Sequence, residues 1–258
     1  MPTFRPIVMS TVQYDAELRT GQIQPAEVLG LARRLGVDGV ELRDVYWSDK
    51  AAEILTCRAL SVELGLTLTY ATFARIFDVE PNGRESVRQA IVDGAALGAR
   101  IVRIFPGPVP DDSKKSEWDQ SEALVRFAAE QGVTLALENF ARSPGGTLEE
   151  VASTLDRFRQ SSIGANVDIG NYAQNGQDVP TAIERLNDRV AYAHLKHMRK
   201  VRDSSEATFL GGGDNSLDLT LAAFARLPQP VTFCLEFAGG GDPEGRIQKS
   251  VAFLAGNG

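Results

Sequence analysis

The chain has 258 residues, 43% of them hydrophobic and 24% charged, and a formal net charge of −7. This length suits one (β/α)8 barrel of about 250 residues, and we expect a single domain over residues 1–258 because no Pro/Gly-rich linker divides the chain. The acidic balance disfavours a nucleic-acid partner, and no apolar stretch approaches the roughly 18 residues that would span a membrane.

The N-terminus and the cysteines favour a cytoplasmic protein. The first ten residues contain one Arg and a short apolar run, which is typical of a first strand and not of a signal peptide. Cys57 and Cys234 lie far apart and have no partner at metal-ligand spacing, so two reduced thiols are expected.

Strand-like and helix-like segments alternate along the whole chain. The predicted strands are Pro6–Thr11, Gly39–Arg43, Leu66–Ala71, Arg100–Phe105, Val133–Glu138, Ile163–Asp168, Val190–Lys196 and Val231–Phe237. Helix start signals lie between them: Pro25 suits a first turn, and Thr147 with Glu150 forms a capping box. Repeated βα units predict a parallel sheet, and eight strands favour closure into a barrel over an open doubly wound sheet. No GxGxxG follows the first strand, which further disfavours a dinucleotide-binding fold.

The last four predicted strands each lead into one potential metal ligand. The runs TLALEN, ANVDIGN, AYAHLKH and TFCLEF place there Glu138, Asp168, His194 and Glu236. A charged group at the end of an apolar run is costly unless it is paired, solvated or coordinated. Four such ends on consecutive strands predict one metal ion held at the mouth of the barrel.

Alternation within these strands supports the same interpretation, because alternate residues of a barrel strand face the interior. Each ligand-type residue shares its face with small or polar residues, and the apolar residues take the other face. The inward set is Thr134, Ala136, Asn166, Tyr192, Lys196, Thr232 and Cys234, with Glu41 and Arg43 on one face of the second strand and Arg103 inside the fourth.

Two Glu, one Asp and one His make a hard, mostly oxygen ligand set. It suits one divalent ion, with Mn²⁺ favoured and Mg²⁺, Co²⁺ or Zn²⁺ as alternatives, although Zn²⁺ usually draws more nitrogen or sulfur. Such an ion leaves positions for a hydroxy-ketone, polarises its carbonyl and stabilises an enediolate, while a neighbouring carboxylate moves the proton.

Further polar residues are candidates for the site. Lys196, on the His194 face, is expected to bind or stabilise a substrate oxygen, the alternative being a salt bridge to a ligand carboxylate. Arg103 is expected to contact a substrate carboxylate or phosphate, or to pair with a neighbouring Glu such as Glu41. The remaining candidates for substrate contact are Glu41, Asn171 and His197. The basic cluster HLKHMRKVR is either a solvated loop or a positive rim for an anionic or polar substrate.

The four motifs ALEN, VDIGN, AHLK and LEF together resemble the xylose-isomerase-like TIM-barrel superfamily, as do GVDGVE near the second strand and LGGG after the seventh. The resemblance covers essentially the whole chain. It implies that Glu138, Asp168, His194 and Glu236 bind the metal and that Glu138 and Glu236 also act as an acid/base pair. The two histidines of this chain disfavour the AP-endonuclease branch, because its trinuclear zinc site needs several.

Two departures bear on the reaction. The ketose epimerases of the superfamily carry His three residues after the Asp, where this chain has Asn171, and many relatives carry Asp where this chain has His197. The expected function is a metal-dependent isomerase or epimerase of a sugar or polyol-ketone. The alternative is a lyase or dehydratase acting on an inosose, dehydroshikimate or a 3-keto-glycoside, and a non-enzymatic sugar-binding scaffold is a third possibility. The expected partner is the small substrate alone, and assembly into a homo-oligomer stays open.

Overall fold

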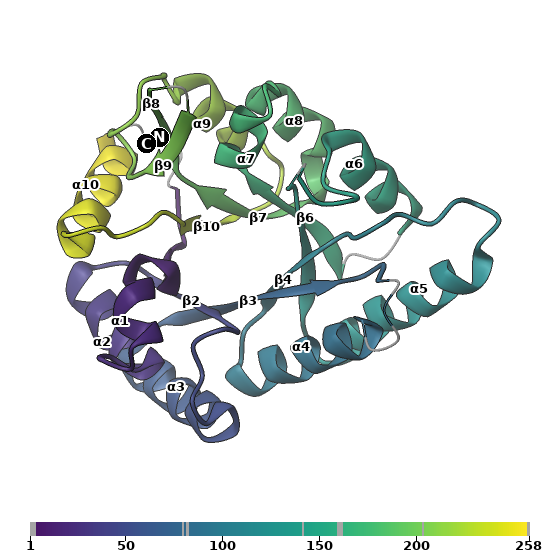
Figure 1. Ribbon diagram of the computed structural model, residues 1–258, viewed down its shortest axis with the longest axis horizontal. Helices are drawn as coiled ribbons and strands as arrows, with labels where there is room; N and C mark the ends of the chain where they lie inside the picture. The colour runs from purple at the N-terminus through teal and green to yellow at the C-terminus, as the bar shows by residue number, and fades with distance from the viewer. Residues whose placement is uncertain are drawn as a thin grey trace.

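A computed structural model of the protein describes residues 4–78, 80, 83–140, 142–158, 162–202 and 204–256. Eight parallel strands close into a barrel in the order β1-β10-β7-β6-β5-β4-β3-β2 (Figure 1). They are β1 (Ile7–Ser10), β2 (Gly39–Arg43), β3 (Thr67–Arg75), β4 (Ile101–Phe105), β5 (Thr134–Glu138), β6 (Ile163–Asp168), β7 (Val190–Leu195) and β10 (Thr232–Leu235). The predicted (β/α)8 barrel is therefore confirmed, and each predicted strand is present.

Helices surround the barrel and cover the outer faces of its strands (Figure 1). They are α1 (Asp15–Arg19), α2 (Pro25–Leu35), α3 (Lys50–Leu64), α4 (Gly83–Leu97), α5 (Lys115–Glu130), α6 (Leu148–Arg157), α7 (Ile169–Gln174), α8 (Val179–Leu186), α9 (Asp218–Ala225) and α10 (Pro243–Gly256), with 3-10 turns at Thr11–Tyr14 and Asn187–Arg189. The predicted start signals hold. Pro25 opens α2, and at α6 Thr147 accepts from the Glu150 amide while the Glu150 carboxylate accepts from the Thr147 amide.

The predicted alternation of inward and outward residues is confirmed by the two apolar clusters. Inside the barrel, Val8, Ala136, Tyr192 and Cys234 form a small cluster of their own. The outward residues of the same strands join the main core between barrel and helices; they include Leu135, Leu137, Ala193, Leu195, Phe233 and Leu235. Because all barrel strands are parallel, their carboxyl ends open on one rim, where βα loops place functional side chains.

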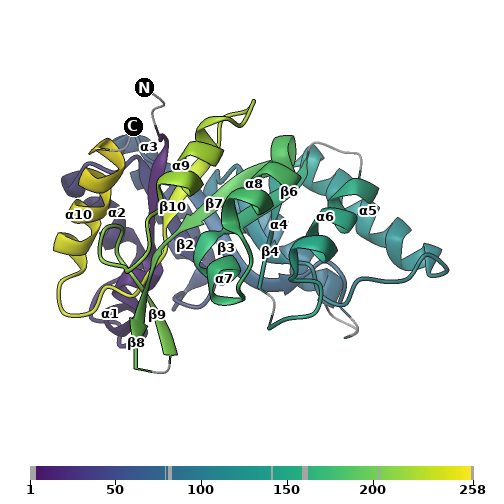
Figure 2. The same cartoon turned by 90° about the horizontal axis from the view of Figure 1, so that it is seen from above.

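A hairpin follows β7, and the sequence pattern does not predict it. It consists of β8 (His197–Val201) and β9 (Ser204–Thr208), paired antiparallel, and it projects beyond the barrel (Figure 2). The basic cluster falls largely on β8, with Arg199 ion-paired to Glu206 across the hairpin. Most of its residues are exposed, so the ribbon lacks the apolar alternation that marks a half-buried strand.

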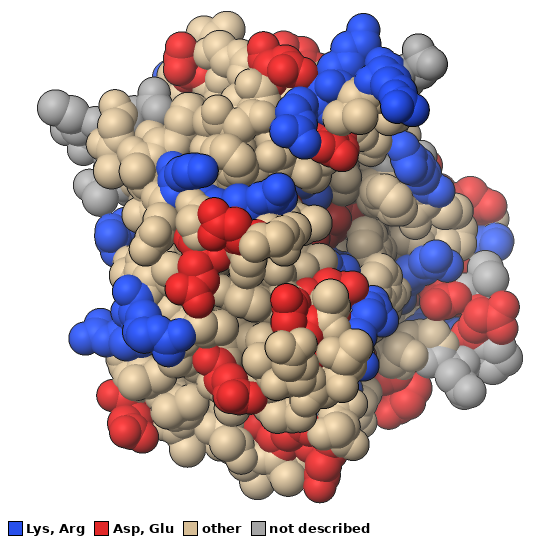
Figure 3. Space-filling model, turned by 60° about the vertical axis from the view of Figure 1, so that its left-hand side comes forward, with Lys and Arg blue, Asp and Glu red and all other residues tan. Residues whose placement is uncertain are grey.

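The surface and the thiols agree with the composition. Positive and negative side chains are interspersed on the face shown in Figure 3, and neither sign covers it. Cys57 and Cys234 are buried, unpaired thiols, as expected. Within the described part of the chain, no helix combines the length and apolar character needed to cross a membrane.

Candidate active site

The barrel brings the four predicted strand-end residues together around one imidazole. His194 on β7 lies beside Asp168 on β6, because these two residues are register partners. Its Nδ1 atom is 3.4 Å from Glu138 Oε2, 3.8 Å from Asp168 Oδ2 and 3.7 Å from Glu236 Oε2. We call the three carboxylates Glu138, Asp168 and Glu236 the acidic triad.

His194 is held from behind by a buried network inside the barrel. Its Nε2 atom is 2.7 Å from Glu41 Oε2, and Glu41 also accepts hydrogen bonds from Ser10 (2.8 Å) and Tyr192 (3.0 Å). Tyr192 is in turn bonded to Thr69. This network turns Nδ1 towards the acidic triad. Glu41 itself is fully buried behind His194, which is not the position expected for a substrate contact.

Three cations face the acidic triad, and we call Arg43, Arg103 and Lys196 the basic triad. Lys196 Nζ lies 2.6 Å from Asp168 Oδ2 and 2.5 Å from Glu236 Oε2. Arg103 Nε lies 2.9 Å from Glu138 Oε2, and its Nη1 donates to the Thr72 carbonyl at 2.7 Å. Arg103 thus pairs with a neighbouring glutamate, as one of the two expectations had it, and that glutamate is Glu138.

Arg43 was placed by the sequence on the same face as Glu41 but was not selected as a site residue. The structure puts its Nη1 atom 3.5 Å from Glu236 Oε1, with the side chain 14% exposed. Alternation on β2 was the signal that could have found it, because Glu41 and Arg43 must point the same way.

Amide side chains fix the acidic triad on the β5 and β6 side. Asn171 Nδ2 donates to Glu138 Oε1 at 3.3 Å and to the Asn139 carbonyl at 3.0 Å. Asn166 donates to Glu138 Oε2 at 3.2 Å, and Asn139 holds the backbone of Asp168 through two hydrogen bonds. Asn171 occupies the chain position where a proton-shuttling His was considered. Its side-chain amide instead orients Glu138.

His197 is not brought into this site. It is 4% exposed and lies on the far side of the chain from Lys196. Its Nε2 atom contacts the Asn215 carbonyl, and its Nδ1 accepts from the Gly211 amide at 3.2 Å. Because alternation sends neighbouring side chains in opposite directions, His197 points away from Lys196. Its two contacts anchor the base of the hairpin to the loop after β9.

Burial and the neighbouring charges shift the pKa values of Glu138 and Glu236 in opposite directions. Burial raises the pKa of Glu138. Arg103 and His194 act to lower this pKa and Glu236 and Asp168 act to raise it, and the pKa remains above its usual value. Burial acts on Glu236 in the same direction, but Lys196, His194 and Arg43 together lower its pKa. Burial alone would lower the pKa of His194, yet Glu41, Glu236 and Glu138 raise it to about 10.

The sequence of this chain matches the family model described as xylose isomerase-like TIM barrel over residues 29–256. The chain belongs to this family. No curated protein sequence matches it significantly.

Solved structures with the xylose isomerase-like fold cover nearly the whole chain. The probable 3-DHS dehydratase AsbF of Bacillus anthracis has a TM-score of 0.77 at 14% identity, covering 97% of this chain and 99% of its own. The D-allulose 3-epimerase of Methylomonas sp. has a TM-score of 0.76 at 17% identity, covering 99% of each chain. A xylose isomerase-like protein of Mycobacterium smegmatis, in complex with magnesium, has a TM-score of 0.72 at 19% identity, covering 98% of this chain and 96% of that one.

The xylose isomerase-like barrel of this chain contains a candidate metal-binding cluster. Glu138, Asp168 and His194 each offer one ligand atom, and these atoms lie within 4.8 Å of one another. The buried His194 Nδ1 has no hydrogen-bond partner among the described residues, although three carboxylates surround it. A buried nitrogen facing carboxylate oxygens fits a divalent cation, since oxygen and imidazole ligands suit Mn²⁺ or Mg²⁺. In a second group, Glu41, His194 and Cys234, the His194 Nε2 atom is already bonded to Glu41.

An aromatic wall stands beside the site on the β3, β4 and β5 side. Phe73 stacks on Phe105 with ring centroids 6.0 Å apart, and Phe105 contacts Phe140 at 6.2 Å. Phe73 is 58% exposed, so its ring is open to a ligand at the mouth.

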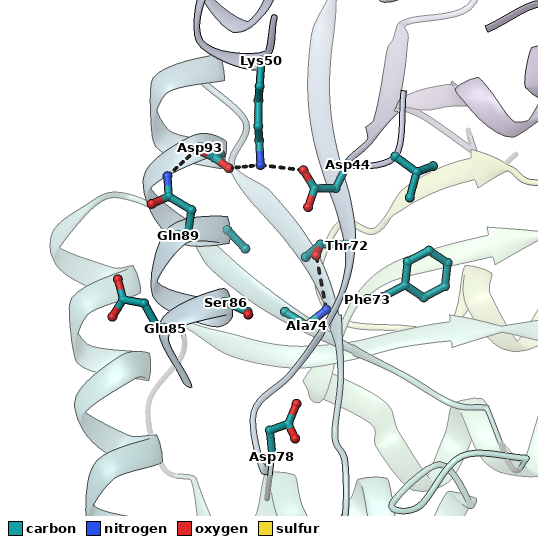
Figure 4. Close-up of a pocket in the computed structure, with 12 residues that line it drawn as sticks. Asp44, Lys50, Thr72, Phe73, Ala74, Asp78, Glu85, Ser86, Gln89 and Asp93 are labelled. Carbon is teal, nitrogen blue, oxygen red and sulfur yellow. Dashed lines mark hydrogen bonds and ion pairs between the residues drawn. The ribbon is translucent and has the colours of Figure 1, made fainter. Parts of the chain in front are cut away.

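A hollow of about 540 Å³ lies on the other side of β3, against α4 (Figure 4). Figure 4 shows Lys50 between Asp44 and Asp93, and Phe73 pointing away from this group. The Nζ atom of Lys50 lies 2.6 Å from Asp44 Oδ1 and 2.5 Å from Asp93 Oδ2. The charges of these three residues are therefore paired with one another, and the aromatic ring belongs to the barrel side.

Proposed function

We propose that the protein is a divalent-metal-dependent isomerase or epimerase of a sugar or related polyol-ketone. The observation that carries the proposal is the acidic triad around the Nδ1 atom of His194, at the carboxyl ends of β5, β6, β7 and β10. The D-allulose 3-epimerase among the structural neighbours supports the substrate class, and the neighbour solved with magnesium supports a metal.

Glu138, Asp168, His194 and Glu236 would hold the metal, with Mn²⁺ favoured by their hard, oxygen-rich set. When bound, the ion would polarise a substrate carbonyl and stabilise the charge that develops as an adjacent proton leaves. Glu41 would keep His194 in the orientation that presents Nδ1, as hydrogen-bonded carboxylates do for metal-binding histidines.

The residues of the chain would carry the proton transfer. Glu138 and Glu236 approach His194 from β5 and from the end of β10, so each can face one side of a substrate carbon. One carboxylate would remove the proton and the other would return it. Lys196, whose ammonium group lies between Asp168 and Glu236, would donate a hydrogen bond to the substrate oxygen.

A dehydratase or other lyase on the same scaffold is the second candidate, and the position of Asn171 favours it. The amide of Asn171 is committed to Glu138 and Asn139, so no titratable group stands where an epimerase-type His is expected. The dehydratase neighbour from Bacillus anthracis supports the same alternative. In that reaction the same base removes the proton, and a leaving group departs before reprotonation.

Solvent-exchange measurements test the proposal. The Mn²⁺-loaded protein is incubated in ²H₂O with a panel of ketoses, inososes, dehydroshikimate and 3-keto-glycosides, and the products are followed by NMR and mass spectrometry. An isomerase puts deuterium into a product of unchanged formula, whereas a lyase gives a product that has lost water or an aglycone.

Variants connect the reaction to the site. Glu138→Gln is expected to slow exchange by about 100-fold or more, because one of two proton-transfer groups is lost. Glu130→Gln, at an exposed position at the end of α5, is the matched control and should behave as wild type. The proposal fails if the purified protein binds no divalent ion after Mn²⁺ is supplied, or if exchange in Glu138→Gln equals that of wild type.

A further inference from the structure

Arg43 is a largely buried guanidinium, 14% exposed, whose hydrogen-bonding capacity is largely unused. A guanidinium has five N–H donors, and leaving buried charged donors unmatched is costly. Among the described residues, Arg43 forms an ion pair with Glu236 alone, at 3.5 Å. The buried Nε atom of Arg43 has no hydrogen-bond partner in the described part of the chain. Arg103 also has a buried Nε atom without a hydrogen bond among the described residues, but this atom is ion-paired with Glu138 at 2.9 Å. In contrast to Arg43, Arg103 also donates a hydrogen bond from Nη1 to the Thr72 carbonyl at 2.7 Å.

Phe73 holds the Arg43 guanidinium at the rim. The Arg43 Cζ atom lies 5.7 Å from the centroid of the Phe73 ring, which also faces Arg103 at 5.8 Å. Stacking on an aromatic face orients a guanidinium while leaving its N–H edge free for an oxygen ligand. Because Phe73 itself is 58% exposed, a ligand at the mouth can reach this pair from the solvent side.

The charge balance of the site points to the kind of ligand. The acidic triad faces the basic triad, so three carboxylates meet three cations, while the Glu41 carboxylate behind them is paired with His194. A divalent cation among the acidic triad would compensate those carboxylates and leave the basic triad with surplus positive charge. A neutral sugar does not offset that surplus, whereas an anionic substrate does.

We propose that Arg43 and Phe73 form an anion-binding subsite on the β2–β3 rim, and that the substrate is a polyol-ketone carrying an acidic oxygen group, a carboxylate or a phosphate. This inference rests on the proposed function and names its substrate class. The carbonyl end of the substrate would lie at the acidic triad, the acidic group at the Arg43 N–H edge, and the carbon chain along the Phe73 ring.

The test is a calorimetric titration of the Mn²⁺-loaded protein with three matched probes. D-fructose is neutral, D-fructuronate carries a carboxylate at C6, and D-fructose 6-phosphate carries a phosphate there. At least one acid should bind about tenfold or more tightly than D-fructose, a difference of about 1.4 kcal/mol, because its charged group gains a hydrogen bond to the Arg43 guanidinium. The acid that binds more tightly identifies the acidic group.

Variants separate the subsite from a general charge effect. Arg43→Gln should remove the preference for the acid over D-fructose, and Arg43→Lys should restore part of that preference. Arg226→Gln, which removes an exposed positive charge paired with Glu184, is the matched control and should keep the full preference.

The failures of the two proposals are distinguishable. Equal binding of the three probes, a preference that survives in Arg43→Gln, or no binding of either acid at millimolar concentration overturns the subsite. A protein that takes up Mn²⁺ and exchanges substrate protons without preferring acids refutes the subsite alone. A protein that takes up no metal refutes the proposed function. The same titration then still shows whether binding of the acids depends on Arg43, which decides the subsite separately.

Discussion

Glu41 shows how one residue deep in the barrel sets the ionisation of the site. Burial alone would raise its pKa, but the charge of His194, the hydrogen bond to it and Arg103 lower that pKa from 4.5 to about 2. Sequence alternation placed Glu41 and Arg43 on one face of the second strand, yet it could not give the depth at which Glu41 lies. That depth depends on the register of β2 with β1 and β3, which pairs Glu41 with Ser10 and Thr69.

The lowered pKa of Glu41 predicts how stability depends on pH. A carboxyl whose pKa is lower in the folded state stabilises the fold above its unfolded pKa, and this contribution is lost as pH falls through the folded value. In the presence of EDTA, Glu41→Gln should lower the free energy of unfolding by about 3–5 kcal/mol near pH 6, because His194 loses its buried partner. The difference from wild type should shrink between pH 4.5 and pH 2.

Urea unfolding at pH 6, 4 and 3 measures this difference, with Glu130→Gln as an exposed control. A gap between wild type and Glu41→Gln that stays constant over this range would show that the Glu41 carboxylate is not held ionised by His194.

At the scale of elements, the short helix α7 positions the Lys196 side chain. Gly170 is its second residue, and a Cβ atom there would lie 2.6 Å from Lys196 Cγ and 2.7 Å from Lys196 Cε. The stem of Lys196 therefore passes directly over the glycine. The sequence predicted Asp168 as the end of β6, but it did not reveal this contact, because the approach of α7 to β7 is a tertiary feature.

Gly170→Ala should displace Lys196 from Asp168 and Glu236. We expect substrate exchange to slow by about tenfold or more and the fold to lose about 1–3 kcal/mol, the usual range for overpacking. The matched control is Gly30→Ala in α2, where the nearest atom to the new Cβ is 3.9 Å away and helix propensity should stabilise the protein. Exchange rates measured alongside thermal unfolding test this, and an undiminished rate in Gly170→Ala would contradict the assigned position of Lys196.

The hairpin β8–β9 is the element that sequence patterns missed altogether. Its mostly exposed residues show no alternation of apolar and polar side chains that would distinguish a strand from a loop. The hairpin is anchored through His197, which contacts the Asn215 carbonyl and the Gly211 amide. Contacts to the loop after β9 cannot be read from local sequence. The eight barrel strands, in contrast, each combine β-forming residues with flanking signals, so both their order and their inward faces were predictable.

For the whole molecule, metal binding should be coupled to folding stability. A ligand that binds only the folded state adds about 2.7 kcal/mol at 100 times its dissociation constant, and about 2–4 °C accompanies each kcal/mol in a domain of this size. We therefore expect Mn²⁺ to raise the melting temperature by roughly 5–11 °C, reversibly with EDTA. Scanning fluorimetry measures the shift. If Asp168→Asn shows the same rise as wild type, the stabilising ion binds elsewhere.

The sequence predicted the barrel, its order of strands and the strand-end residues that meet at His194, because each is encoded locally as a strand and its last residue. It did not predict which cation meets which carboxylate. The pairing of Arg103 with Glu138 and of Lys196 with both Asp168 and Glu236 follows from the closure of the sheet and the tilt of its strands, which bring together residues far apart in the chain.

The pairing of the acidic triad with the basic triad also bears on how the protein matures. Small zinc domains unfold without their ion, because nothing else compensates the ligands. In this barrel Lys196 and the two arginines already offset the carboxylates. We therefore expect the newly made chain to close its barrel before any ion arrives. The metal would then bind reversibly to an already folded barrel, and which divalent ion is bound would depend on which ions the cell makes available.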